Sequence, residues 1–253
     1  MPANFSRTLT GAHRTDKGNR MLGLVLAFVA GASNAGGFLA VHQYTSHMTG
    51  ILSSMADNLV LGAYGLCLAG FSAIACFVLG AATTAFLVNY ARRHALSSEY
   101  ALSLLLEAAL LLGFGIVGAF LTEARGLFVS FTVMLLAFIM GLQNALITKI
   151  SNAQIRTTHV TGIMTDIGIE LGKLFYWNID TTAEKPRVLA DRSKLALLGG
   201  LALLFFLGGV TGAYGFKQFG YVSTVPLALV LTAFASAPAF DDLLRVFRQK
   251  FLS

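Results

Sequence analysis

Long apolar runs separated by short polar stretches dominate the chain. A helix needs about 20 apolar residues to cross the hydrocarbon core of a bilayer. Six runs meet that length, at residues 21–41, 67–90, 100–121, 127–148, 195–216 and 219–239. Glu107 in the third run and Pro226 in the sixth are both tolerated inside a helix bundle. The pattern therefore predicts an all-α polytopic membrane protein with about six transmembrane helices.

Two further stretches, 46–62 and 158–177, have the length of helices but carry polar and acidic side chains. Each begins with the same T-x-H-x-T-G pattern: residues 45–50 read TSHMTG and residues 157–162 read TTHVTG. Flanking segments also match in order, 30–35 with 140–145 and 77–83 with 205–211. Three matches in one order indicate an internal duplication.

The duplication divides the chain into two transmembrane repeats between polar tails. Repeat 1 covers residues 21–121, and repeat 2 covers 127–239 with a polar cytoplasmic insert at 178–193. The remaining segments, 1–20 and 240–253, are expected to be cytoplasmic tails.

The distribution of basic residues favours one topology. If both T-x-H-x-T-G segments are broken or re-entrant, each repeat crosses three times and the second repeat is inverted. Of the 18 Lys and Arg, only Arg125 and Lys217 then lie outside. If both segments cross fully, five basic residues lie outside. Because cytoplasmic loops are enriched in Lys and Arg, we expect 3+3 inverted repeats with both termini in the cytoplasm.

Composition excludes the other broad classes. Hydrophobic residues make up 56% of the chain and charged residues 12%, with a mean hydropathy of +0.72. Soluble domains carry about 25% charged residues. Cys67 and Cys76 lie in one apolar run, so a disulfide scaffold is excluded. The net charge is +6, but the basic residues form no face interleaved with aromatic residues, as binding to a nucleic acid would require. The expected partner is therefore the lipid bilayer.

The duplicated elements are the candidate binding site for a small polar or anionic solute. In the inverted topology they approach the midplane from opposite sides, as in many transporters. Thr45 or Thr157 is expected to cap the helix that follows, whose N-terminal N–H groups attract anions. The expected substrate-binding residues are His47, Thr49, Gly50, His159, Thr161, Gly162, Asn34 and Asn144. In an alternative interpretation, the threonines and glycines serve helix packing, and the two asparagines form hydrogen bonds that hold neighbouring helices together.

Asp166 and Glu170 are the candidate proton-coupling residues, since they lie one helical turn apart and seven or more residues after His159. Like charges at this spacing favour a shared proton. The alternative is that these carboxylates and Asp57 lie at interfacial depth, solvated or paired with Lys173.

Enzyme and cofactor functions find no support in the sequence. No nucleophile-elbow, P-loop, dinucleotide-binding or zinc-ligand motif is present, and the His–Asp spacing fits no recognised metal site. We therefore expect no enzyme activity, no cofactor and no metal.

The chain resembles the YoaK-like family of small bacterial inner-membrane proteins, a domain of unknown function (number 1275). The resemblance rests on residues 31–37, on the Thr45–Gly50 element, on 140–145, and on Thr158, Thr161 and Gly162. Members commonly read Asp where Asn34 stands and Asn where Ile51 stands. The resemblance implies a polytopic inner-membrane protein of about six crossings, often described as a permease, and it supplies no substrate.

The expected function is a small secondary transporter or permease for a small polar or anionic solute, with proton coupling. The alternative is a membrane-embedded structural or accessory protein without transport activity. A homodimer is expected because six helices barely enclose a path, and Gly208 and Gly209 are candidates for its packing face.

Overall fold

The computed structural model describes residues 16–42, 44–120, 125–151, 158–179 and 187–251. The described residues form helices and connecting segments without a strand, which confirms the predicted all-α class. The helices are α2 (Asp16–Val41), α3 (Met48–Val60), α4 (Tyr64–Arg93), α5 (Ala101–Phe120), α6 (Arg125–Ile150), α7 (Val160–Leu174), α8 (Arg192–Phe219), the 3-10 turn η1 (Gly220–Ser223) and α9 (Thr224–Phe251).

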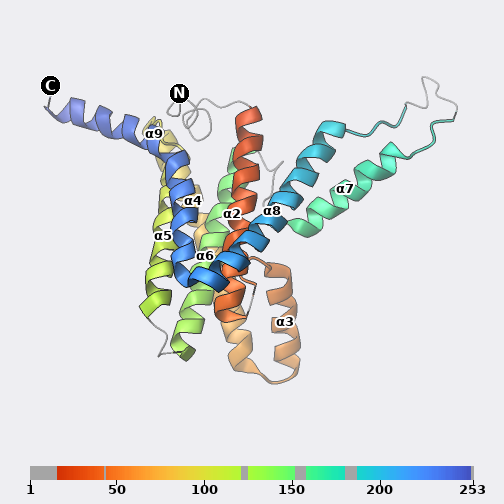
Figure 1. The fold of residues 1–253 in the computed structure, drawn as a ribbon, viewed down its shortest axis with the longest axis horizontal. Helices are drawn as coiled ribbons and strands as arrows, with labels where there is room; N and C mark the ends of the chain where they lie inside the picture. Colours follow the sequence, from red (N-terminus) through yellow and green to blue (C-terminus); the bar gives the residue numbers. More distant parts are fainter. Residues whose placement is uncertain (1–15, 43, 121–124, 152–157, 180–186, 252–253) are drawn as a thin grey trace.

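Five stretches of the described chain are long and apolar enough to span a membrane. They are Lys17–Ala40, Tyr64–Arg93, Ala101–Ala119, Ser130–Ile150 and Arg192–Leu244. The fifth has 53 residues and contains α8, η1 and most of α9. The chain reverses direction between α8 and α9 (Figure 1), where Gly220 ends α8 with a φ of 61° that favours glycine.

The helices extend further into the tails than the apolar pattern predicted. α2 begins at Asp16 and α9 continues to Phe251, so both predicted tails are partly helical. A helix pairs its own backbone groups and therefore continues beyond the apolar span. Pro238 lies inside α9, which changes direction in its second half (Figure 1), because proline removes one helical hydrogen bond and displaces a carbonyl.

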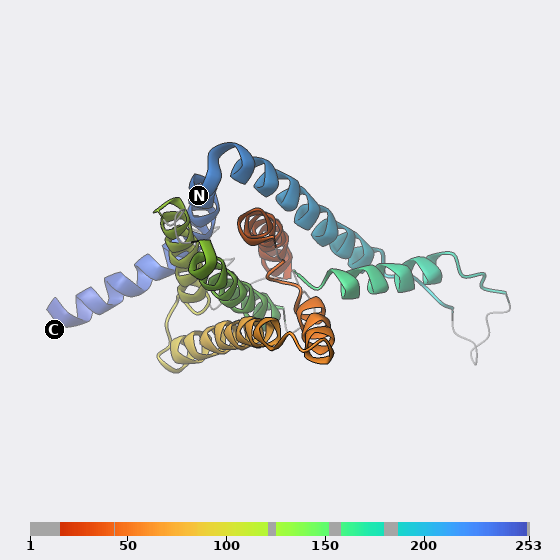
Figure 2. The same ribbon diagram turned by 90° about the horizontal axis from the view of Figure 1, so that it is seen from below.

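The long helices pack in pairs that join the two predicted repeats. α2 makes its most extensive contacts with α8, α6 with α4, and α5 with α9. α3 packs on α4 and α7 on α8, and both short helices project from the bundle (Figures 1 and 2).

Glycine permits the closest of these contacts. A Cβ on Gly31 would lie 2.0 Å from the Phe205 carbonyl oxygen, where α2 crosses α8. A Cβ on Gly141 would lie 1.9 Å from the Phe77 carbonyl oxygen, where α6 crosses α4. Both distances are too short for any larger residue, so the backbones of these pairs are in direct contact.

Two further glycines complete the crossings from the opposite side. Gly208 faces the Phe28 carbonyl oxygen and Gly80 faces the Phe138 carbonyl oxygen, each at 2.0 Å from an ideal Cβ. The expectation that Gly208 and Gly209 form a dimer interface is therefore wrong for Gly208, because this glycine is buried against α2 of the same chain.

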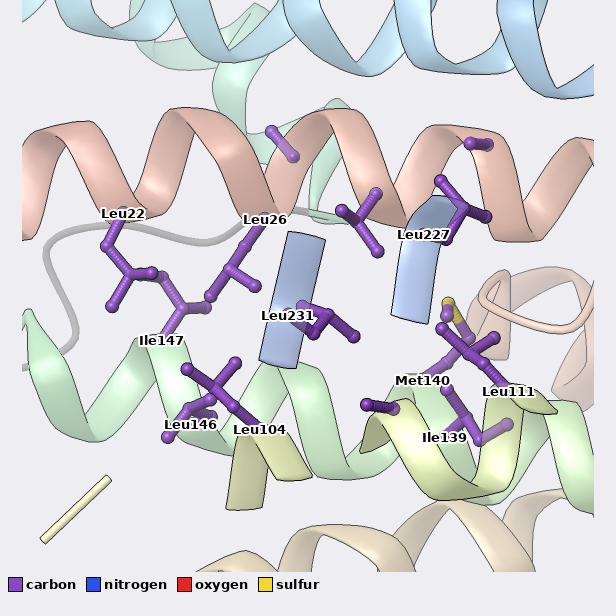
Figure 3. Close-up of a cluster of buried hydrophobic side chains, with 14 of the residues drawn as sticks. Leu22, Leu26, Leu104, Leu111, Ile139, Met140, Leu146, Ile147, Leu227 and Leu231 are labelled. Atoms are coloured by element: carbon purple, nitrogen blue, oxygen red, sulfur yellow. The ribbon is translucent and has the colours of Figure 1, made fainter. Parts of the chain in front are cut away.

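A leucine-rich core lies where α2, α5, α6 and α9 meet (Figure 3). Leu26, Leu104, Leu146 and Leu231 are fully buried, one from each of these helices. Outside this core, large apolar side chains such as Phe86 and Phe206 are exposed on the surface of the bundle.

The crossing of α4 and α6 gives the first prediction. Gly141→Ala should destabilise the protein by about 1–3 kcal/mol, because the new methyl group meets a backbone carbonyl that cannot rotate away. Gly113→Ala is the matched control, since a Cβ there meets no atom within 4 Å. Thermal unfolding of both variants in one detergent measures the difference. Equal midpoints would contradict the direct backbone contact.

Candidate functional site

Each duplicated element forms the start of a short helix. His47 is the N-cap of α3 and His159 is the N-cap of α7, with similar backbone angles (φ −93°, ψ 69° and φ −86°, ψ 55°). Neither histidine caps its helix with its own side chain, so among the described residues the first N–H groups have no capping partner. The two helix starts can therefore donate hydrogen bonds to a bound group.

The expectation that Thr45 caps α3 is wrong. Thr45 precedes the N-cap by two residues and is 1% exposed, and its hydroxyl has no hydrogen-bond partner. The equivalent Thr157 lies outside the described residues. In both helices the N-cap carbonyl accepts the first helical hydrogen bond: Ile51 N–H donates to the His47 carbonyl oxygen at 3.1 Å, and Ile163 N–H donates to the His159 carbonyl oxygen at 3.0 Å.

The glycine of each element lies beside the histidine ring. A Cβ on Gly50 would be 2.1 Å from Cδ2 of His47, and a Cβ on Gly162 would be 3.3 Å from Cδ2 of His159. Each imidazole therefore lies over the first turn of its helix. Both histidines remain exposed, as do Thr49 and Thr161 in the same turns.

Asn34 and Asn144 hold the two elements to the preceding long helices. The Ser46 hydroxyl donates to Oδ1 of Asn34 at 2.9 Å, and the Thr158 hydroxyl donates to Oδ1 of Asn144 at 2.7 Å. The two bonds join equivalent positions of the predicted repeats. Both asparagines are predicted site residues, whereas their hydroxyl partners Ser46 and Thr158 are not. The signal was present, because the second residue of each T-x-H-x-T-G element carries a hydroxyl.

The two halves of the candidate site approach each other near the middle of the molecule. In Figures 1 and 2 the first turns of α3 and α7 lie close together beside α2, and the helices then point away in different directions. The predicted binding residues thus form two clusters, one at each helix start.

Asp166 and Glu170 lie away from this centre, on the side of α7 that packs against α8. Glu170 is 2% exposed and binds Nζ of Lys173 at 2.9 Å and the backbone N–H of Asp191 at 2.9 Å. Lys194 Nζ lies 3.6 Å from Asp166 and 3.8 Å from Glu170. Lys173 and the Asp191 N–H hold the pKa of Glu170 below its usual range.

These contacts match the alternative in which the carboxylates pair with lysine. Their role in proton coupling stays a prediction. Asp57 on α3 is exposed. Among the described residues, no cluster of His, Cys, Asp and Glu forms a metal site.

Residues 22–237 match the model of a family described as a protein of unknown function, DUF1275, and the chain therefore belongs to that family. No curated protein and no solved structure matches the chain.

The ion pairs of Glu170 give a pH-dependent prediction. A lowered pKa means that the contact stabilises the docking of α7 above the ordinary glutamate pKa of about 4.3, and that this stabilisation is lost as the pH falls through the lowered value. The only tryptophan of the chain, Trp177, lies three residues after the end of α7 and is exposed. Its fluorescence anisotropy should be constant above roughly pH 5 and fall below about pH 4.

Glu170→Gln should give the lower anisotropy at neutral pH as well. Asp57→Asn, which changes an exposed carboxylate of α3, serves as the control and should behave like the unmodified protein. An anisotropy of Glu170→Gln equal to that of the unmodified protein at pH 7 would show that these ion pairs do not hold α7.

Proposed function

We propose that this DUF1275 member is a small secondary transporter or permease that binds a small polar or anionic solute between the starts of α3 and α7. The site consists of His47, Thr49, Gly50 and Asn34 from one repeat and His159, Thr161, Gly162 and Asn144 from the other. The duplicated Asn–hydroxyl bond carries this proposal, since it fixes the two helix starts in the same way.

An inverted repeat accounts for the arrangement of the helices. We take α8 and α9 as separate crossings, which gives six with α2, α4, α5 and α6. In Figure 1, α2 runs in the direction opposite to its counterpart α6, and α4 opposite to α8. The paired contacts are also duplicated: Gly31 with Phe205 corresponds to Gly141 with Phe77. In this proposal α3 and α7 are the re-entrant halves of broken segments.

The charges support cytoplasmic termini at an inner (plasma) membrane. The start of α2, the ends of α4, α6 and α7, and the start of α8 gather on the upper side of Figure 1. These ends carry Lys17, Arg20, Arg92, Arg93, Lys149, Lys173, Arg192 and Lys194. Arg125 and Lys217 belong to the opposite ends of α6 and α8. The positive-inside rule assigns the upper side to the cytoplasm.

The chemistry of the site favours solutes that accept hydrogen bonds. Two uncapped helix starts supply N–H donors and the positive ends of two helix dipoles. Exposed imidazoles and threonine hydroxyls add adjustable donors. Helix starts that converge near mid-membrane are a recurring way for transporters to bind anionic groups.

Binding by the purified protein tests the proposal. A thermal-shift screen with phosphate, sulfate, nitrate and small carboxylates should find at least one stabilising anion. His47→Ala and His159→Ala should each weaken its binding about tenfold or more, since each removes a donor at the site. His94→Ala is the control, because that exposed histidine ends α4.

Uptake of the same anion into proteoliposomes then separates the two functions. Transport that is lost in the His47 and His159 variants supports the permease. Binding without uptake favours the alternative of a structural or accessory membrane protein. Variants that bind and transport like the unmodified protein would show that the site lies elsewhere.

A further inference from the structure

Glu107 is an acidic side chain buried in the core of the bundle. It lies in the middle of α5, within the apolar span Ala101–Ala119, and is 0% exposed. Neither carboxyl oxygen has a hydrogen-bond partner. The hydroxyl of Ser103, one helical turn earlier on the same face, is also buried and unpaired. Polar groups that are buried without hydrogen-bond partners destabilise a folded protein. The Glu107 carboxyl group and the Ser103 hydroxyl therefore indicate that something binds here.

The packing of α5 against α6 indicates what Glu107 faces. In Figure 3, Leu104 of α5 lies by Leu146 of α6, and Leu111 lies by Ile139 and Met140. α5 and α6 run in opposite directions (Figure 1), so each step forward along α5 is matched by a step back along α6. Glu107, three residues after Leu104, then lies at the level of Gln143, three residues before Leu146.

Gln143 offers a hydrogen-bond acceptor at that level. Its side chain is fully buried, and its Nε2 donates to the Leu26 carbonyl oxygen of α2 at 3.2 Å. That bond leaves the amide oxygen Oε1 buried and without a partner. Two unpaired acceptors, a carboxylate and an amide oxygen, repel each other unless a donor lies between them.

We propose that Glu107 carries a proton in the membrane interior and donates it in a hydrogen bond to Oε1 of Gln143, which forms an exchangeable proton site between α2, α5 and α6. Proton binding converts the carboxylate into a carboxylic acid with one O–H donor, and no other reactant is needed. If the protein is the transporter proposed above, this acid is its proton-coupling group. The coupling role rests on that proposed function, whereas the proton site does not.

No described countercharge competes with the proton. α5 has no other titratable residue. On α2, α4 and α6 the charged groups lie at or near the helix ends, and on α9 they lie in its second half, from Asp241 onward. The remaining titratable side chains are Tyr64, Cys67, Cys76 and Tyr90 of α4 and Tyr221 of η1. The charged groups are Asp16, Lys17, Arg20, Arg92, Arg93, Arg125, Lys149, Asp241, Asp242, Arg245, Arg248 and Lys250. Glu107 thus differs from Asp166 and Glu170, which both face lysines.

Infrared spectroscopy of the purified protein tests the site without knowledge of a solute. The protein at pH 7 should show the carbonyl stretch of a protonated carboxylic acid, shifted in D₂O, and Glu107→Gln should abolish it. Glu99→Gln is the matched control, because Glu99 lies just before α5 and forms an ion pair with Arg92. Gln143→Leu should move the band to higher frequency, since it removes the acceptor of the acid proton.

Three results would overturn the proton site. The first is a spectrum at pH 7 that does not differ between the unmodified protein and Glu107→Gln. The second is a band that disappears when sodium chloride replaces choline chloride, which would assign the site to a sodium ion. The third is loss of the band in Glu99→Gln. If Glu107→Gln does not fold, the Gln143→Leu shift decides the question by itself.

The coupling role has a separate readout. Uptake of the stabilising anion driven by a pH gradient should be lost in Glu107→Gln while anion binding is retained. A proton site with no anion uptake in any variant leaves the site established and contradicts the proposed transport. Uptake that remains gradient-driven in Glu107→Gln contradicts the coupling role alone.

Discussion

Direct contact between backbones at the two glycine crossings determines the rest of the architecture. At these points a carbonyl oxygen of one helix occupies the space that a side chain would take on the other. Because α2 crosses α8 and α6 crosses α4, the first helix of each predicted repeat is held by a helix of the other. The N-terminal and C-terminal halves of the chain therefore interlock rather than stand side by side. That interlocking brings the starts of α3 and α7 to the same region of the molecule (Figure 2).

Much of this fold could be predicted because apolar length and repetition are properties of the sequence itself. The six long runs and both weaker stretches are helices, and the matched segments around Gly31, Gly80, Gly141 and Gly208 are the crossings. The pairing of helices could not be predicted, since glycine positions show where a helix can pack closely but not which other helix packs there. The capping prediction for Thr45 failed because the helix begins two residues later than a threonine cap at position 45 requires.

The site was predicted in its components but not in its contacts. The histidines, glycines and asparagines recur because each half builds the same turn, and repetition made them visible. The partners of Asp166 and Glu170 include Lys194, which follows them by more than twenty residues and belongs to another helix. Glu107 was noted as an isolated acid in an apolar run, yet only its burial and the register with Gln143 distinguish it from the paired carboxylates.

The central claim is that the two repeats are inverted, so that α3 and α7 enter from opposite sides of the membrane. Cysteine accessibility tests it most directly, in a background of Cys67→Ser and Cys76→Ser. Tyr64→Cys follows α3 and Trp177→Cys follows α7, and both positions are exposed. A membrane-impermeant thiol reagent should label Tyr64→Cys in intact cells and Trp177→Cys only after lysis. Labelling of both from the same side would contradict the inverted arrangement.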